Sequence, residues 1–263
     1  VNSSGVVASD VSAVGTARER LAACGYGGDK GIFGYGKTSG VVSMSNLVSN
    51  SGVVATDVSG VGTARHILAA CGYGGDKGIF GFGNDGSYTG VTNLVSNAGV
   101  VASDVSAVGT ARHALAACEY GGDKGIFGFG YTGSIVGMTN LVSNAGVVAS
   151  DVSAVGTVRY GLAACSYDYD KGIFGYGNDG SSAVSLTNLV SNVGVVASDV
   201  TGVGTARYTL AATEYGGDKG IFGFGTNGSV TAVTNLVSNS GVVATDVSGV
   251  GTARYYLAAC SYN

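Results

Sequence analysis

Aspartate and arginine recur as a pair along the whole chain. The pairs, each eight residues apart, are Asp10 with Arg18, Asp57 with Arg65, Asp104 with Arg112, Asp151 with Arg159, Asp199 with Arg207 and Asp246 with Arg254. A guanidinium can bind a carboxylate or turn carbonyls, and a buried charge must be paired. Catalysis does not need six equivalent copies of one site, so we expect structural ion pairs or turn locks. The alternative is a ring of arginines that captures anions.

Five cysteines share one repeated position, at the end of the string LAAC. They are Cys24, Cys71, Cys118, Cys165 and Cys260, and Thr213 takes the same place in the remaining copy. Neighbouring copies should lie farther apart than the roughly 5.5–6 Å between Cα atoms that a disulfide allows. Exchange with threonine suits a small, tightly packed strand position. We therefore expect buried free thiols rather than disulfides or a metal site, which fits assembly in a reducing cytoplasm.

The two histidines, His66 and His113, each follow a repeated arginine, where other copies carry glutamate or tyrosine. Because this position varies, neither histidine is expected to act as a base or a ligand. No Ser-His-Asp set stands out, and the repeated string GGDKG lacks the pattern of a phosphate-binding loop. We therefore expect a protein that is not an enzyme and that holds no cofactor and no metal.

Sequence variation concentrates in the loop that follows the repeated string GIFGFG or GIFGYG. Loops on a rigid scaffold tolerate change and often carry function. Sugar sites commonly combine an aromatic face with Asn or Asp hydrogen bonds, so these loops supply candidate ligand-binding residues. The candidates are Asn84, Asp85, Tyr88, Tyr131, Asn178, Asp179 and Asn227. The alternative is that these residues only form solvated hairpin turns, for which NDG and TNG are well suited.

The elements that must position these residues follow from an internal repeat. The string GTAR, or GTVR in one copy, ends at Arg18, Arg65, Arg112, Arg159, Arg207 and Arg254, in steps of 47 or 48 residues. Each repeat contains four short apolar stretches between glycine-rich turns, of the types VTNLVSN, GVVASDV, ARYYLAACSY and KGIFGFG. Their Val, Ile, Tyr, Phe and Thr residues favour strands. Four strands per repeat predict an all-β fold, a β-propeller of four-stranded blades, with a β-solenoid as the alternative.

We expect one domain over residues 1–263, with five full repeats and a sixth partial repeat. The repeat units fall at about 1–45, 46–92, 93–139, 140–187, 188–234 and, for the partial unit, 235–263. Near-identical repeats can pair in the wrong register or swap between chains. We therefore expect oligomers or domain-swapped species.

The repeat resembles the kelch blade of the galactose-oxidase central domain. The resemblance places Arg65 and the string HILAAC at the innermost strand and KGIFGFG, from Lys77 to Gly83, at the second. GVTNLVSN and GVVASDV would form the outer pair. The copper ligands of galactose oxidase have no match here, so the resemblance implies the fold and not the activity. The near-identical units are also similar in style to tandem repeats in appendage and structural proteins of marine bacteriophages.

Composition narrows the function classes. The net charge is −4, charged residues make up 11% and hydrophobic residues 45% of the chain. This balance argues against intrinsic disorder and against a basic nucleic-acid-binding face. No apolar run approaches the roughly 18 residues of a membrane span. The first residues lack the basic and apolar regions of a signal peptide. We expect cytoplasmic synthesis, a final place in a virion or on an extracellular surface, and no nucleic-acid or membrane partner.

The resulting functional hypothesis is a non-enzymatic structural or adhesive β-propeller module, a virion structural or appendage protein that presents a repeated binding surface. Its expected partners are other copies of itself, other virion or structural proteins, and cell-surface glycans. One alternative is a multivalent carbohydrate-binding lectin with sites in the variable loops, where linked weak sites raise avidity. A second alternative is a kelch-type oxidase.

Overall fold

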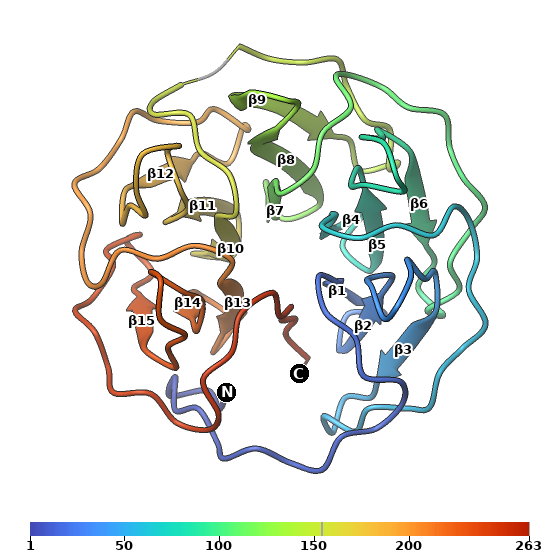
Figure 1. The fold of residues 1–263 in the computed structure, drawn as a ribbon, viewed down its shortest axis with the longest axis horizontal. Helices are drawn as coiled ribbons and strands as arrows, with labels where there is room; N and C mark the ends of the chain where they lie inside the picture. The colour runs from blue at the N-terminus through green and yellow to red at the C-terminus, as the bar shows by residue number, and fades with distance from the viewer. Residues whose placement is uncertain (154, 263) are drawn as a thin grey trace.

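The protein contains five separate β-sheets, each of three antiparallel strands (Figure 1). The computed structural model describes residues 1–153 and 155–262, which leaves out Ala154 and the last residue of the predicted partial repeat, Asn263. Every named element in the described part of the chain is a strand, and none is a helix. The predicted all-β class is therefore confirmed, and these residues offer no helix that could span a membrane.

Each sheet follows the chain order from an inner to a middle to an outer strand. The inner strands are β1 (Ala22–Tyr26), β4 (Ala69–Tyr73), β7 (Ala116–Tyr120), β10 (Ala163–Tyr167) and β13 (Ala211–Tyr215). The middle strands are β2 (Lys30–Gly34), β5 (Lys77–Gly81), β8 (Lys124–Tyr131), β11 (Lys171–Gly175) and β14 (Lys219–Gly223). The outer strands are β3 (Ser45–Val48), β6 (Thr92–Val95), β9 (Ile135–Val142), β12 (Thr187–Val190) and β15 (Thr234–Val237).

Alternation along the inner strands separates two faces. In β7, Ala116, Cys118 and Tyr120 are buried, while the side chains between them point the other way and are only partly covered. In four of the five sheets the turn to the middle strand has two glycines with positive φ, such as 64° and 73° at Gly121 and Gly122, whereas Asp168 and Tyr169 take this conformation before β11. The repeated string YGGDK therefore encodes a tight hairpin between the inner and middle strands.

Consecutive sheets pack face to face through a glycine and a phenylalanine. A Cβ atom added to Gly81 of β5 would lie 2.7 Å from the ring of Phe127, which belongs to β8 in the next sheet. Gly34 stands in the same relation to Phe80. The hydrophobic core is correspondingly divided into clusters that each join two neighbouring sheets. The repeated KGIFG string therefore supplies both the glycine and the phenylalanine through which consecutive sheets pack.

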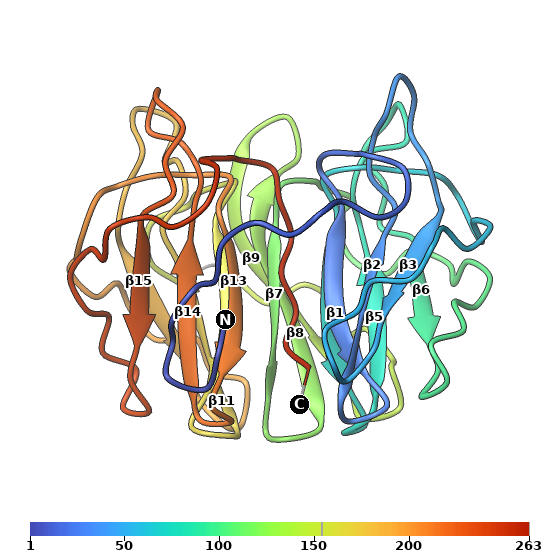
Figure 2. The ribbon, with the colours of Figure 1, turned by 90° about the horizontal axis from the view of Figure 1, so that it is seen from below.

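The five sheets surround a common centre in chain order, with their strands running along the central axis (Figures 1 and 2). A closed set of six backbone hydrogen bonds lies at one end of this axis, formed by the second residue after each repeated arginine. Ile67, Ala114, Gly161, Thr209, Tyr256 and Arg20 each donate an N–H to the carbonyl oxygen of the preceding member, over 2.6–3.0 Å. The last of these bonds joins Arg20 to Tyr256 and so links the two ends of the chain.

The predicted fourth strand of each repeat is not formed as a strand. The GVVASDV segments pair with the outer strands through isolated bridges, such as Val54 with Val48 and Val58 with Ser45, rather than through a continuous ladder. The reason is that these segments lie at the periphery, where the second valine packs against the core, as Val148 does, while Val53 is 64% and Val58 46% exposed. The sheets are therefore three-stranded where four strands were predicted.

The predicted sixth, partial repeat forms no sheet of its own within the described residues. Its last part, residues 254–262, descends between β13 and β1, and the first residues of the chain run past the same place on the outside (Figures 1 and 2). The two ends of the chain thus share one position around the axis.

Candidate functional site

The repeated arginine is a buried structural lock. Arg65, whose side chain is 0% exposed, donates from Nε to the backbone oxygen of Phe82 over 2.8 Å and from Nη2 to Oδ1 of Asn93 over 2.7 Å. Its guanidinium carbon lies 4.2 Å from the ring centre of Tyr35 in the preceding sheet. Such contacts hold the middle and outer strands of one sheet against its neighbour.

The aspartate partner differs from the one that the sequence spacing predicts. Arg112 pairs with Asp151 of the following repeat at 3.7 Å, rather than with Asp104, which lies eight residues before it. Asp151 also accepts hydrogen bonds from the backbone N and the hydroxyl of Thr110, over 3.0 and 2.6 Å. Burial lowers the pKa of Arg112 to about 10, against the attraction of Asp151.

The same cross-repeat pairing recurs around the molecule. Arg18 pairs with Asp57, Arg159 with Asp199 and Arg254 with Asp10. The last pair joins the end of the chain to its beginning, at 3.0 Å. Arg65, Arg112, Arg159 and Arg207 are all fully buried, which favours the structural lock over the alternative of an anion-capturing ring. These four arginine–aspartate pairs link successive repeats, and at the other two junctions the hydroxyls of Thr63 and Thr205 donate to Asp104 and Asp246 over 2.6 Å.

The predicted Asn and Asp ligand residues act within their own loops. Oδ1 of Asn84 accepts a hydrogen bond from the backbone N of Gly86 over 2.9 Å, and Oδ1 of Asp85 accepts one from Ser87 over 3.0 Å. The same local bonds are made by Asn178 to Gly180, by Asp179 to Ser181 and Ser182, and by Asn227 to Ser229. These contacts stabilise tight turns, which supports the alternative reading of these five residues.

The two predicted tyrosines come together in an aromatic cluster. Tyr88 lies over His113 with ring centres 4.9 Å apart and an interplanar angle of 10°, and its ring centre is 6.1 Å from that of Tyr131. Tyr131 contacts Tyr160 at 6.0 Å, and Tyr160 contacts Tyr208 at 6.5 Å. We call these five residues the aromatic cluster. They come from four successive repeats, so one continuous surface is assembled from separate loops.

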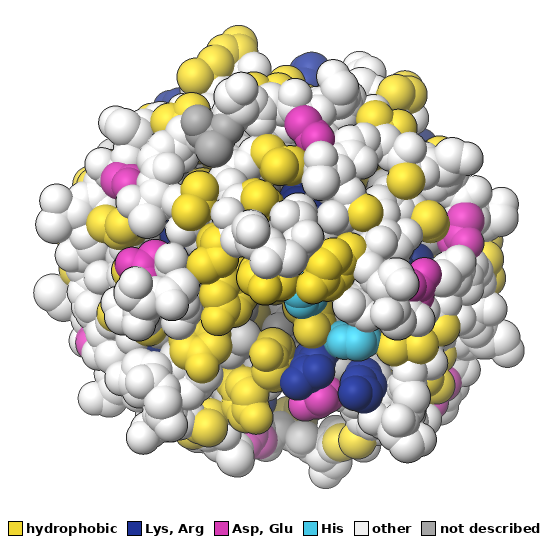
Figure 3. Space-filling model, turned by 45° about the horizontal axis from the view of Figure 1, so that its top comes forward, with side chains coloured by type: hydrophobic (Ala, Val, Ile, Leu, Met, Phe, Trp, Pro, Cys, Tyr) yellow, Lys and Arg dark blue, Asp and Glu magenta, His cyan; other side chains and the backbone are white. Residues whose placement is uncertain are grey.

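The aromatic cluster borders the upper cavity, a hollow of about 130 Å³ on the central axis. His113, Tyr160 and Tyr256 line this cavity together with leucines of the inner segments. Figure 3 shows this face, with hydrophobic, histidine and basic side chains around a central hollow. Burial, with a smaller contribution from His66, lowers the pKa of His113 to about 4, so its ring is neutral at pH 7. Arg20 supplies the nearby cation, 4.5 Å from the ring centre of Tyr256. A flat or weakly polar group suits this lining.

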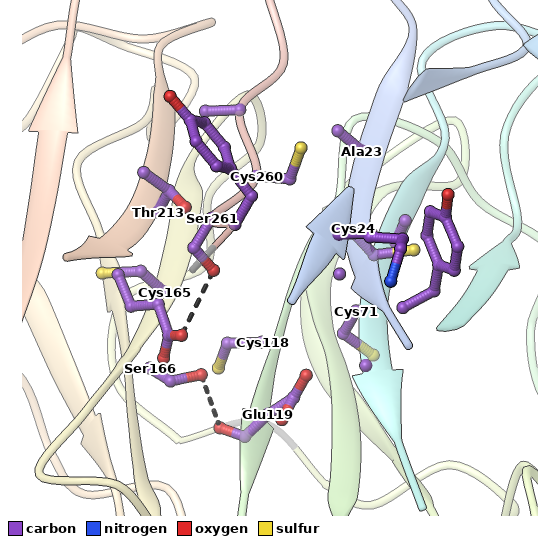
Figure 4. Close-up of a pocket in the computed structure, with 18 of the residues that line it drawn as sticks. Ala23, Cys24, Cys71, Cys118, Glu119, Cys165, Ser166, Thr213, Cys260 and Ser261 are labelled. Carbon is purple, nitrogen blue, oxygen red and sulfur yellow. Dashed lines mark hydrogen bonds between the residues drawn. The ribbon is translucent and has the colours of Figure 1, made fainter. Parts of the chain in front are cut away.

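The lower cavity, of about 160 Å³, lies along the same axis between the inner strands (Figure 4). All five cysteines are free, and four of them are buried, as predicted, while Cys260 is partly covered. Burial raises the pKa of Cys118 to about 12, so this thiol is neutral and unreactive at pH 7. The cysteines therefore serve packing.

Two carboxylates in the lower cavity were not predicted as site residues. Burial and, to a smaller degree, Glu214 raise the pKa of Glu119 to about 7. Burial also raises the pKa of Glu214, whose Oε1 accepts a hydrogen bond from the hydroxyl of Ser261 over 3.2 Å. The sequence carried a signal for both, because each directly follows the buried Cys position, and strand alternation turns it toward the axis.

Neither cavity has an arrangement of ligands that would hold a metal. Across residues 1–153 and 155–262, no three or more His, Cys, Asp or Glu side chains are grouped as metal ligands. No protein-family model matches the sequence, and a search of curated proteins finds no match.

Proposed function

We propose that the protein is a non-enzymatic structural and adhesive module of a virion or its appendage, in which a repeated scaffold presents one variable face. One observation carries the proposal. The repeated arginines are buried and bonded to acceptors within the protein, whereas residues that vary between repeats gather at the aromatic cluster. Arg65 shows the first kind of residue, fully buried and bonded to protein acceptors, and Tyr88 the second, with 38% of its surface exposed.

We further propose that the scaffold is a kelch-like β-propeller with six sectors, five formed by the sheets and one by the two ends of the chain. The closed set of six backbone hydrogen bonds supports this arrangement, since it gives the end segment the same place as the five others. The salt bridge between Arg254 and Asp10 supports it too.

Carbohydrate binding is the second candidate, and the aromatic cluster favours it. Stacked and edge-on rings offer flat apolar faces beside the phenol groups of Tyr88 and Tyr131, a combination that suits the face of a sugar ring. The upper cavity is small enough to receive one substituent of such a ring. Under this proposal the ligands are cell-surface glycans, and binding requires no metal.

A glycan array tests the second candidate. We expect saturable binding to one sugar class, weakened at least tenfold in the double variant Tyr88→Ala, Tyr131→Ala. The control is Tyr169→Ala, because Tyr169 is 73% exposed but lies in the turn before β11, outside the cluster. Equal binding by both variants would reject the aromatic cluster as the site. No binding to any glycan would leave the structural role and reject the lectin.

A further inference from the structure

The space between the sheet of β13, β14 and β15 and the sheet of β1, β2 and β3 lacks a sheet of its own. We call it the open sector, bounded by residues 1–11 and 254–262. Two adjoining cavities occupy it, of about 640 and 310 Å³. The first is lined by Val7, Gly223 and Arg254 among others, and the second by Phe33 and Thr213.

The end of the chain already holds the place of an inner strand there. A Cβ added to Gly31 would lie 2.5 Å from Sγ of Cys260, and one added to Gly78 would lie 2.5 Å from Sγ of Cys24. Residues 258–262 therefore lie against β2 of the following sheet in the same way as β1 lies against β5. Unlike β1, however, residues 258–262 make no backbone–backbone hydrogen bond to any described residue, so their edge is free.

Three side chains around the open sector are more exposed than their counterparts in other repeats. Phe33 is only partly buried, whereas the equivalent Phe80, Phe127, Phe174 and Phe222 are 0% exposed. Val11 is 89% exposed, while its five counterparts are 45–48% exposed. The Arg254 side chain is 45% exposed, against 0% for Arg112. In the other repeats the equivalent residues contact the middle or outer strand of a sheet, as Phe80 does at Gly34, Arg65 at Asn93 and Val58 at Ser45.

An alignment of the repeats identifies the segment that would fill the open sector. Tyr262 aligns with Tyr73 and Val1 aligns with Val95. Among the described residues, the sector therefore holds no counterpart of residues 75–94, GDKGIFGFGNDGSYTGVTNL. In the second sheet this stretch contains β5 and most of β6. A hairpin of this sequence carries the phenylalanine and the glycine through which consecutive sheets pack in the rest of the molecule.

The two walls are complementary to such a hairpin. Gly223 is the only one of the five equivalent glycines without a phenylalanine ring against it: the nearest atom to its added Cβ is Cγ2 of Thr234, at 3.3 Å. On the opposite side of the open sector, Phe33 lacks a glycine partner. Each of its counterparts packs against a glycine of the preceding sheet, as Phe80 does against Gly34. Arg254 likewise lacks an acceptor equivalent to Oδ1 of Asn93, which receives the Nη2 donor of Arg65.

We propose that the open sector binds a β-hairpin of the repeat's own sequence, supplied by a second polypeptide. The hairpin adds a strand to the free edge of residues 258–262, seats its phenylalanine on Gly223 and places its glycine against Phe33. Its asparagine accepts from Arg254. This surface is separate from the aromatic cluster, so it joins copies of the repeat while the variable face stays free.

The test uses the 263-residue chain and a synthetic peptide with the sequence of residues 75–94. Calorimetry is expected to show one peptide bound per chain, and thermal unfolding is expected to shift upward by several degrees. Replacing the peptide phenylalanine that corresponds to Phe80 with alanine should weaken binding at least tenfold. Oligomers of the chain that dissociate when peptide is added would identify a second copy as the natural donor and would also support the proposal.

A chain variant supplies the decisive comparison. In Gly223→Ala the methyl group lies 3.3 Å from Cγ2 of Thr234, a tight contact that a small shift of this side chain relieves. In the other sheets a Cβ at this position lies 2.6–2.7 Å from the phenylalanine ring. This variant should fold and lose the peptide. The control Gly40→Ala, at a glycine with nothing within 4 Å of the added Cβ, should bind normally. Absence of peptide binding to the unaltered chain, or equal binding by Gly223→Ala, would overturn the proposal.

Discussion

Replacing Arg112 with methionine tests whether the repeated arginine is a structural lock. Its side chain is 0% exposed and donates to the backbone oxygens of Phe129 and Thr110, over 2.9 and 3.1 Å, and to Oδ1 of Asn140 over 2.6 Å. Each acceptor left unsatisfied in a buried place costs about 1–3 kcal/mol. Because methionine recovers part of the packing, we expect the free energy of unfolding to fall by about 3–5 kcal/mol in total.

The matched control is Arg254→Met, which removes the same residue type from the same repeat position. The Arg254 side chain is 45% exposed and pairs with an exposed aspartate, so a much smaller loss is expected. Urea unfolding followed by circular dichroism measures both variants. Equal losses, or a loss below about 1 kcal/mol for Arg112→Met, would refute the assignment of the arginine as a buried lock.

Three further predictions follow from the core. Burial raises the pKa of Glu119 to about 7, so the charged carboxylate lowers the free energy of unfolding by an amount that grows as pH rises from 4.5 through 7. Glu119→Gln should therefore raise the melting temperature at pH 8 but not at pH 4. An equal shift at both pH values would contradict this. The four buried thiols, Cys24, Cys71, Cys118 and Cys165, should react with a thiol reagent only after unfolding, and rapid labelling of these four in the native protein would be inconsistent with their burial. Gly81→Ala should cost about 1–3 kcal/mol in urea unfolding, because its Cβ would lie 2.7 Å from the Phe127 ring; the smaller effect expected of Gly223→Ala is the control.

Most of the fold was predictable from the repeat, and the errors have physical causes. In the second sheet, for example, AACGY, KGIFG and TNLV form the three strands because their buried residues alternate or run continuously. The predicted fourth strand, GVVASDV, has the composition of a strand but little surface to cover it, as the 64% exposure of Val53 shows. Strand propensity could not reveal that lack of a packing partner.

The site was predictable only in part. The role of the arginines was recognised from their repetition, but spacing along one repeat suggested the wrong aspartate, since Arg112 reaches Asp151 across a junction between repeats. Tyr88 and Tyr131 were identified from loop variation, yet their meeting with His113 depends on the arrangement of successive loops around the axis. Whether a variable loop residue caps its own turn, as Asn84 does, is settled by local geometry that composition does not contain.

The most direct test of the account is the binding of whole bacterial cells by the unaltered chain and by the double variant Tyr88→Ala, Tyr131→Ala. We expect saturable binding by the unaltered chain and by Tyr169→Ala. This binding should be lost in the double variant, while the variant's melting temperature stays within a few degrees of that of the unaltered chain. Undiminished cell binding by a folded double variant would contradict the central claim that the aromatic cluster is the adhesive face of the molecule.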